Sequence, residues 1–305
     1  MYDDQLRDLE EKSFVERYSV NPAVFAIIVL VSIFIIYQGV GAILTFIVIG
    51  RVGITSDVVW QMRWLMAGSE ICLIFIPTLI FARLFTRKSY EVFKFRIPGG
   101  LESLLALLSF LALQRVFEAY IFFQELIPLP DAISQIIEPI KESFKMTTKL
   151  LIRSETSVEL LFVIFVAAVV PAIVEELLFR GLIQRIFEKV MSPLVSAVLA
   201  GTIFGLYHMN PFEIIPLIGL GVFFGILRYR SGTLTLPIAL HFLNNFMSVL
   251  ASYFGLNEDN LLSKPGATVG VETMLFELML SLGLFFVTFI AYLRTTRDIS
   301  RNFYR

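Results

Sequence analysis

The sequence contains few of the residues that build disulfides, metal clusters or nucleic-acid surfaces. Among its 305 residues there are one cysteine and two histidines, so no disulfide can form within the chain. The net charge is −1, which excludes the strongly basic surface typical of nucleic-acid binding. No internal repeat or low-complexity segment is visible. The chemistry of this chain therefore depends on a small number of polar residues.

Apolar side chains, in contrast, are abundant. Hydrophobic residues make up 57% of the chain, and phenylalanine alone contributes 30 residues. A helix needs about 20 apolar residues to cross the hydrocarbon core of a bilayer, and eight segments approach this length. These segments are residues 22–50, 62–85, 101–123, 157–181, 192–208, 212–229, 233–254 and 271–293. The sequence therefore predicts an all-α, polytopic membrane protein with about eight transmembrane helices.

The apolar pattern divides the chain into three parts. Residues 1–21 are polar and lack the basic-then-apolar order of a secretory signal peptide, so we expect a cytoplasmic amphipathic arm. Residues 22–293 form the membrane domain, and residues 294–305 form a cytoplasmic tail. Most Lys and Arg residues lie in the loops on the same side as the termini. The positive-inside rule then predicts that both termini are cytoplasmic.

Two patterns predict local packing. In the long connection 124–156, apolar residues recur at helical spacing from Ile133 to Phe144, with lysines between them, which predicts an amphipathic helix at the outer membrane interface. Glycine pairs spaced by four residues occur in the fifth and sixth spans and predict close helix contact. These pairs are Gly201/Gly205 and Gly221/Gly225.

Polar side chains inside membrane spans are costly and therefore suggest a functional site. Glu175 lies in the fourth span, and the only two histidines, His208 and His241, lie in later spans. If the fourth and fifth spans form a hairpin that turns near Met191, Glu175 and His208 both lie about 24 Å from the turn. His241 can reach the same layer, so we expect the three side chains to converge.

The spacing of these polar residues is helical. Residues four apart lie on the same face of a helix, and this spacing occurs in the pairs Glu176/Arg180, Phe204/His208 and His241/Asn245. Glu175 is rotated by about 100° from Glu176, so the two carboxylates need not have the same role. Arg115 and Glu118 in the third span are three residues apart, and we interpret them as an internal structural ion pair.

The polar motifs resemble those of the CPBP family of intramembrane proteases, which is also called the Abi or type II CAAX prenyl endopeptidase family. The family motif EExxxR is present as EELLFR, which begins at Glu175, and FxxxH is present as FGLYH, which ends at His208. The third motif is present as HFLNN, from His241 to Asn245. All three fall in order within a motif core of residues 171–250.

The resemblance implies an eight-helix membrane domain with a cytoplasm-accessible intramembrane cavity, in which a peptide bond is hydrolysed. It implies that Glu175 activates water with help from His208, while His241 and Asn245 stabilise the oxyanion. The supporting residues would be Glu176, Arg180 and Phe204. The implied partners are the lipid bilayer and a lipidated or transmembrane polypeptide substrate, with a prenylated CAAX-type C-terminus as one substrate class.

Glu175, His208 and His241 are also residue types that bind zinc. The motif HExxH is absent, and no span has two histidines one helical turn apart. The sequence therefore favours metal-free glutamate catalysis without a cofactor, with zinc on these three residues as the alternative. The serine and aspartate motifs of other intramembrane proteases, GxSG and GxGD in a span, do not occur.

Two functions without proteolysis are also compatible with the sequence. The chain would serve as a membrane scaffold or immunity protein if the site residues were kept for structural reasons. It would serve as a proton-coupled transporter if the glutamates and histidines formed a relay, although transporters commonly show repeats and paired broken helices that are not visible here.

Overall fold

The computed structural model describes residues 12–50, 56–88, 92–256, 270–297 and 299. Within this part of the chain the regular structure is entirely helical and contains no strand. This result confirms the all-α prediction. The first eleven residues of the predicted arm and most of the predicted tail lie outside the described residues.

The helical elements follow one another along the chain, and several of them join end to end into longer helices. They are α2 (Phe14–Arg17), α3 (Pro22–Phe34), η1 (Ile35–Val40), α4 (Gly41–Ile49), η2 (Ser56–Val58), α5 (Val59–Ser69), η3 (Glu70–Phe75), α6 (Ile76–Phe85), α7 (Gly100–Glu125), α8 (Asp131–Ile152), α9 (Ser157–Ile164), η5 (Phe165–Val169), α10 (Val170–Glu176), η6 (Leu177–Ile183), α11 (Gln184–Phe187), α12 (Pro193–Tyr207), α13 (Ile214–Ser231), α14 (Thr235–Tyr253) and α15 (Val271–Thr295).

All eight predicted spans are helical, and six helical stretches in the described residues are long and apolar enough to cross a bilayer. These stretches are Pro22–Ile49, Ser56–Phe85, Gly100–Glu125, Ser157–Phe187, Ile214–Ser231 and Val271–Thr295. The chain is therefore an integral multi-pass membrane protein. The α12 helix is apolar but has only 15 residues, and α14 has polar side chains at His241, Asn244 and Asn245. Eight complete crossings thus remain a prediction.

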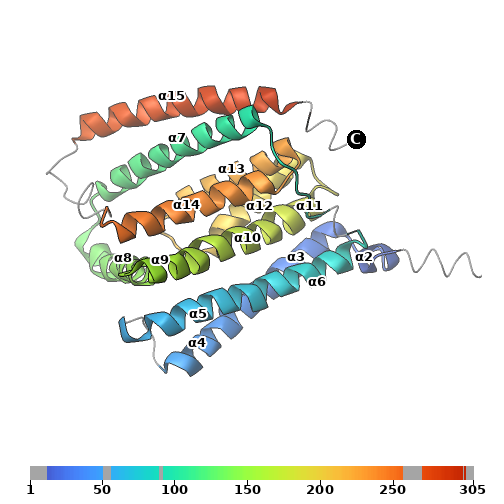
Figure 1. Cartoon of the computed structure of the whole chain (residues 1–305), viewed down its shortest axis with the longest axis horizontal. Coiled ribbons are helices and arrows are strands. Elements are labelled where there is room, and N and C mark those ends of the chain that lie inside the picture. Colours follow the sequence, from blue (N-terminus) through green and yellow to red (C-terminus); the bar gives the residue numbers. More distant parts are fainter. Residues whose placement is uncertain (1–11, 51–55, 89–91, 257–269, 298, 300–305) are drawn as a thin grey trace, which may run out of the picture.

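The helices lie roughly side by side (Figure 1). The α7 and α15 helices pack together on one side of the bundle, and α3 to α6 lie on the other side. Between them lie α10, α12, α13 and α14. The three sequence motifs lie on α10 with η6, at the end of α12, and on α14. The core has two buried clusters, one centred on α3, α10, η6 and α12, and the other on α7, α13 and α14. The motif-bearing helices therefore lie in the interior of the bundle.

In the described residues, four π-helical segments interrupt the long helices, namely η1, η3, η5 and η6. A π-helical turn inserts an extra residue and rotates the following side chains, and such turns are frequent at functional sites. Here η3 begins at Glu70, and η6 begins directly after Glu176. Both segments also pack against each other. The sequence pattern had predicted ordinary helices here and gave no sign of these turns.

The α12–α13 hairpin is packed through the predicted glycine pairs. A Cβ atom added to Gly201 would lie 2.3 Å from the backbone nitrogen of Val222 and 2.4 Å from the backbone carbon of Gly221. Added to Gly205, it would lie 2.6 Å from the backbone nitrogen of Ile218. Only glycine allows backbones to approach this closely, so the predicted close contact is confirmed.

The predicted amphipathic helix is α8, and none of its residues is buried. Its apolar residues, including Ile136 and Phe144, are exposed in the described structure, as expected for a helix whose apolar face lies against lipid. The buried Arg63 of α5 holds the far end of α8, because its guanidinium donates hydrogen bonds to the carbonyl oxygens of Leu151, at 2.9 Å, and of Arg153.

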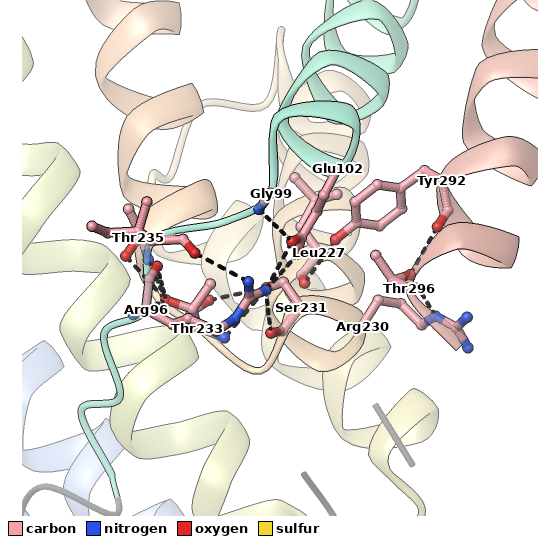
Figure 2. A network of polar contacts seen from close by, with 11 residues as sticks. Arg96, Gly99, Glu102, Leu227, Arg230, Ser231, Thr233, Thr235, Tyr292 and Thr296 are labelled. Atoms are coloured by element: carbon pink, nitrogen blue, oxygen red, sulfur yellow. Dashed lines mark hydrogen bonds and ion pairs between the residues drawn. The ribbon is translucent and has the colours of Figure 1, made fainter. Parts of the chain in front are cut away.

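A polar network fixes the start of α14 (Figure 2). The guanidinium of Arg96 donates to the carboxylate of Glu102 at 2.7 Å and to the carbonyl oxygen of Ser231 at 3.0 Å. The backbone N–H of Arg96 donates to the Thr233 hydroxyl at 2.8 Å, and the Tyr292 hydroxyl donates to the Leu227 carbonyl at 3.2 Å. The network joins α7, α13 and α15 at the turn before α14, the helix that carries His241.

Candidate active site

Glu175 and Glu176 at the end of α10 have different surroundings. The side chain of Glu176 is fully buried, and that of Glu175 is 18% exposed. One residue of helical rotation separates them by about 100°, so they face different neighbours. The two adjacent carboxylates therefore belong to two different sets of contacts, as the sequence predicted.

Glu176 joins two of the predicted motifs. Its Oε1 atom accepts a hydrogen bond from Arg180 Nη1 at 2.6 Å and another from His241 Nδ1 at 2.9 Å. Because the carboxylate is an acceptor only, the Nδ1 atom of His241 must carry the hydrogen. This contact fixes the orientation of the His241 ring and directs its Nε2 atom away from Glu176.

Arg180 is fully buried, and several partners offset the cost of removing its guanidinium from water. Its Nη2 atom donates to the carbonyl oxygen of Gly221 at 2.9 Å. Its guanidinium also lies 4.3 Å from the ring centre of Phe204 and 5.5 Å from that of Phe224, which are cation–π distances. A buried ion pair needs such additional partners to offset desolvation. The group therefore holds α13 and α12 against the helix that carries both glutamates.

Both histidines face Glu175. The Nε2 atom of His208 lies 3.9 Å from Glu175 Oε2, and the Nε2 atom of His241 lies 3.8 Å from the same oxygen. This oxygen is buried and has no hydrogen-bond partner among the described residues. The predicted convergence of these three side chains from three helices is therefore present in the structure.

His208 is the residue that directly follows α12, and its ring is oriented from within its own segment. Its Nδ1 atom lies 2.9 Å from the carbonyl oxygen of Phe204, and this oxygen can only accept. The ring of Phe204 packs edge-on against His208, with ring centres 4.7 Å apart, and against His241 at 5.8 Å. Phe224 stacks on the other face of His241 at 5.6 Å. Aromatic rings thus enclose the imidazole of His241, whereas the side chain of His208 is 30% exposed.

Asn245 occupies the position one turn after His241 on α14, but its hydrogen bond is to a neighbour. Its Oδ1 atom accepts from the amide of Asn244 at 3.0 Å, and Asn244 in turn accepts from Gln114 of α7 at 2.7 Å. Within the described residues no hydrogen bond joins Asn245 to Glu175 or to either histidine. The structure therefore brings Glu175, His208 and His241 together and leaves Asn245 beside them on the same helix.

One buried acid near this site was missed by the sequence analysis. Glu70, the first residue of η3, is 4% exposed, and its Oε2 atom has no hydrogen-bond partner. The η3 segment packs against α10, the helix that ends with Glu175 and Glu176. The rule that polar residues within spans are functional candidates applied to Glu70 as well, and it would have identified this residue.

The predicted ion pair between Arg115 and Glu118 is confirmed. It lies on α7 and is not part of the cluster around Glu175. Arg115 donates to Glu118 and, at 2.7 Å, to Glu277 of α15. These three side chains are exposed, with Arg115 at 51%, and they link α7 to α15. The pair is therefore structural, as interpreted from its spacing.

The motif region agrees with a known family. Residues 157–247 match the family model described as type II CAAX prenyl endopeptidase Rce1-like. This region, which is less than a third of the 305 residues, is similar to that family. The match to this Rce1-like family implies a protease, and it covers α9 to most of α14, including all three motifs and every residue of the cluster around Glu175. Searches among curated proteins and among solved structures found no match.

The residue types at this site leave zinc as an alternative cofactor, because two imidazoles and a carboxylate can form a three-ligand zinc site. In the described part of the chain, no group of three His, Cys, Asp or Glu side chains is placed to hold a metal ion. We therefore derive no catalytic step through a metal.

Proposed function

We propose that the chain is an intramembrane endopeptidase that hydrolyses a peptide bond of a membrane-associated polypeptide. A single observation carries this proposal: two imidazole Nε2 atoms, on His208 and His241, face one unpartnered carboxylate oxygen of Glu175 at 3.9 and 3.8 Å. These separations are too long for direct hydrogen bonds and suit groups that share a water molecule.

Water activation is assigned to Glu175 and His208. The Nδ1–H of His208 is engaged by a neutral carbonyl oxygen, which leaves Nε2 as an acceptor that can orient the water. Glu175 removes one proton from this water as a general base. The water oxygen then forms a bond to the carbonyl carbon of the substrate, and the carbonyl oxygen becomes the oxyanion.

Oxyanion stabilisation is assigned to His241, with Asn245 as a second donor one turn away. The carboxylate of Glu176 contacts His241 Nδ1 at 2.9 Å and stabilises the imidazolium form, which donates from Nε2. Each donor of an oxyanion site typically lowers the barrier by about 2.7–4 kcal/mol. Glu176, Arg180 and Phe204 are positioning residues in this scheme.

Collapse of the tetrahedral intermediate breaks the C–N bond. The proton taken by Glu175 is transferred to the departing nitrogen, so the products are a carboxylic acid and an amine, and Glu175 is regenerated. At neutral pH the acid gives up its proton and the amine gains one, so they are present as a carboxylate and an ammonium ion. The proton balance closes with these groups and needs no further reactant.

The proposed substrate class is taken from the family match. An Rce1-like family match supports a prenylated CAAX-type C-terminus as the substrate class, with the lipid anchor held in the bilayer beside the helices. We further propose that both termini are cytoplasmic, so that the peptide end of the substrate reaches the site from the cytoplasmic side.

The test is hydrolysis of a farnesylated CAAX tetrapeptide by the purified protein in detergent or liposomes. We expect the wild-type chain and the surface variant Glu142→Gln to release the C-terminal tripeptide, and Glu175→Gln and His208→Ala to release none while remaining folded. A wild-type protein that cleaves neither this peptide nor a library of membrane peptides would instead support the scaffold alternative.

A further inference from the structure

Three side-chain amides form a hydrogen-bonded chain from α7 to Asn245. Gln114 Nε2 donates to Asn244 Oδ1 at 2.7 Å, and Asn244 Nδ2 donates to Asn245 Oδ1 at 3.0 Å. We propose that Gln114 is a positioning residue that, through Asn244, turns the amide of Asn245 so that its N–H groups are available to the substrate. This inference rests on the proposed function, in which Asn245 is the second oxyanion donor.

The two ends of the Asn245 amide have opposite chemistry. An amide oxygen only accepts hydrogen bonds, and an amide nitrogen only donates them, so only the nitrogen can stabilise an oxyanion. The oxygen of Asn245 is held by Asn244, and within the described residues no hydrogen bond engages the nitrogen. Asn245 lies four residues after His241 on α14 and therefore on the same helix face. The nitrogen remains as a donor beside His241.

The three amides can reverse only together. If one of them turned over alone, two oxygens or two N–H groups would face each other, and both hydrogen bonds of a central amide would be lost. The end of Gln114 that faces Asn244 therefore decides which end of Asn245 faces the oxyanion. In the structure the donor end of Gln114 faces Asn244, which is the direction that an oxyanion donor at Asn245 requires.

The helix α7 presents Gln114 on a face that packs toward the site. One turn before it, the buried Phe110 lies 6.4 Å from the ring centre of Phe224, and Phe224 stacks on His241 at 5.6 Å. The α7 helix also contacts α14 directly. Gln114 lies outside the family match, residues 157–247, so α7 adds this contact to the matched region.

The variant Gln114→Glu reverses the amide chain. A carboxylate only accepts, so the Asn244 nitrogen must turn toward it, and the Asn245 nitrogen must then turn toward Asn244. We expect kcat for a farnesylated CAAX peptide to fall about a hundredfold at pH 8, the cost of one oxyanion donor, with little change in KM. The variant Gln114→Lys keeps a donor at this position and should keep most of the activity.

Two comparisons separate positioning from other effects of the new charge. In the Asn245→Ala background, Gln114→Glu should cause no further loss, because two residues that act through one interaction are not additive. A charge that acted through space would lower kcat in both backgrounds. The matched control is Gln124→Glu, the same change on the same helix, where the amide donates to the Phe212 carbonyl at 3.0 Å. Its kcat should stay close to that of the wild type.

A readout without activity follows the amides directly. In protein labelled with ¹⁵N-asparagine, the side-chain amide signals are assigned by their loss in Asn244→Ala and Asn245→Ala. We expect Gln114→Glu to shift the Asn245 signal and Gln124→Glu to leave it in place. If Gln114→Glu does not fold, Gln114→Leu removes the donor and should shift the same signal, with a smaller fall in kcat that is absent in the Asn245→Ala background.

The inference is overturned by wild-type kcat in a folded Gln114→Glu protein, by an equal fall in the Asn245→Ala background, or by an unshifted Asn245 signal. A wild-type protein that cleaves no peptide contradicts the peptidase function instead. In that case a shifted Asn245 signal still supports the coupling of the three amides, so the two failures are distinguishable.

Discussion

The carboxylate of Glu176 contacts the imidazole Nδ1 of His241 at 2.9 Å, although the two residues are 65 positions apart in the chain. The same oxygen atom accepts from Arg180 at 2.6 Å. One buried acid therefore orients the histidine that faces Glu175 and keeps a hydrogen on its Nδ1 atom. This arrangement divides the adjacent glutamates into one that reacts and one that positions.

The variant Glu176→Gln tests this division. Glutamine keeps the shape of the side chain but removes the charge that stabilises the His241 imidazolium. We expect kcat to fall about a hundredfold or more, by analogy with loss of a histidine-orienting acid or an oxyanion donor, with a small change in KM. The measurement is steady-state cleavage of a farnesylated peptide.

A matched control for this variant is Glu188→Gln. Glu188, the residue after α11, is also a buried acid, with its side chain 2% exposed, and it pairs with Arg228 at 2.6 Å. Its loss should lower the thermal stability but leave the kcat of the folded protein intact. A Glu176→Gln protein with wild-type kcat would show that the charge on Glu176 has no role in turnover.

The glycine contact between α12 and α13 predicts a stability effect. In Gly201→Ala the new Cβ would meet backbone atoms at 2.3 to 2.6 Å, so the helices must separate. We expect destabilisation of about 1–3 kcal/mol, the usual cost of overpacking. The same change at Gly283, where nothing lies within 4 Å, should be neutral or slightly stabilising because alanine favours helix. Unfolding in detergent, followed by circular dichroism, compares the two.

Removal of metal ions distinguishes the two mechanisms that the sequence leaves open, which are metal-free catalysis by Glu175 and catalysis by bound zinc. If Glu175 and His208 activate water directly, dialysis against EDTA or phenanthroline should leave the rate of cleavage unchanged. Loss of activity that returns on addition of zinc would assign the three residues as ligands and overturn the metal-free proposal. Binding of zinc to the wild-type protein and to His208→Ala, measured by metal analysis, gives an independent readout.

The capping box of α2 predicts that the stability of this short helix, which lies outside the membrane-spanning segments, depends on pH. Hydrogen bonds from the backbone N–H and the hydroxyl of Ser13 lower the pKa of Glu16, as part of the capping box of α2. A lowered pKa in the folded state means that this stabilisation is complete above the unfolded value, about 4.3, and is lost as the pH falls through the folded value. Hydrogen exchange of the arm should therefore be slower in the wild type than in Glu16→Gln at neutral pH. The difference should disappear in acid, and an unchanged difference there would contradict the capping role.

The sequence determined the parts of this protein that depend on local spacing. Apolar length placed the helices, because a backbone in lipid must satisfy its own hydrogen bonds. The glycine spacing gave the α12–α13 contact, and the scarcity of histidine singled out His208 and His241. Helical rise alone placed Glu175 and His208 at one depth.

Only the tertiary structure decided which side chains pair. The contact of His241 with Glu176, and the contacts of Arg180 with Gly221 and two aromatic rings, depend on helix rotation. The four π-helical turns change that rotation without a recognisable sequence signal. A one-residue change in phase turns a side chain by about 100°, so spacing predicts the depth of a buried group, whereas packing selects its partner.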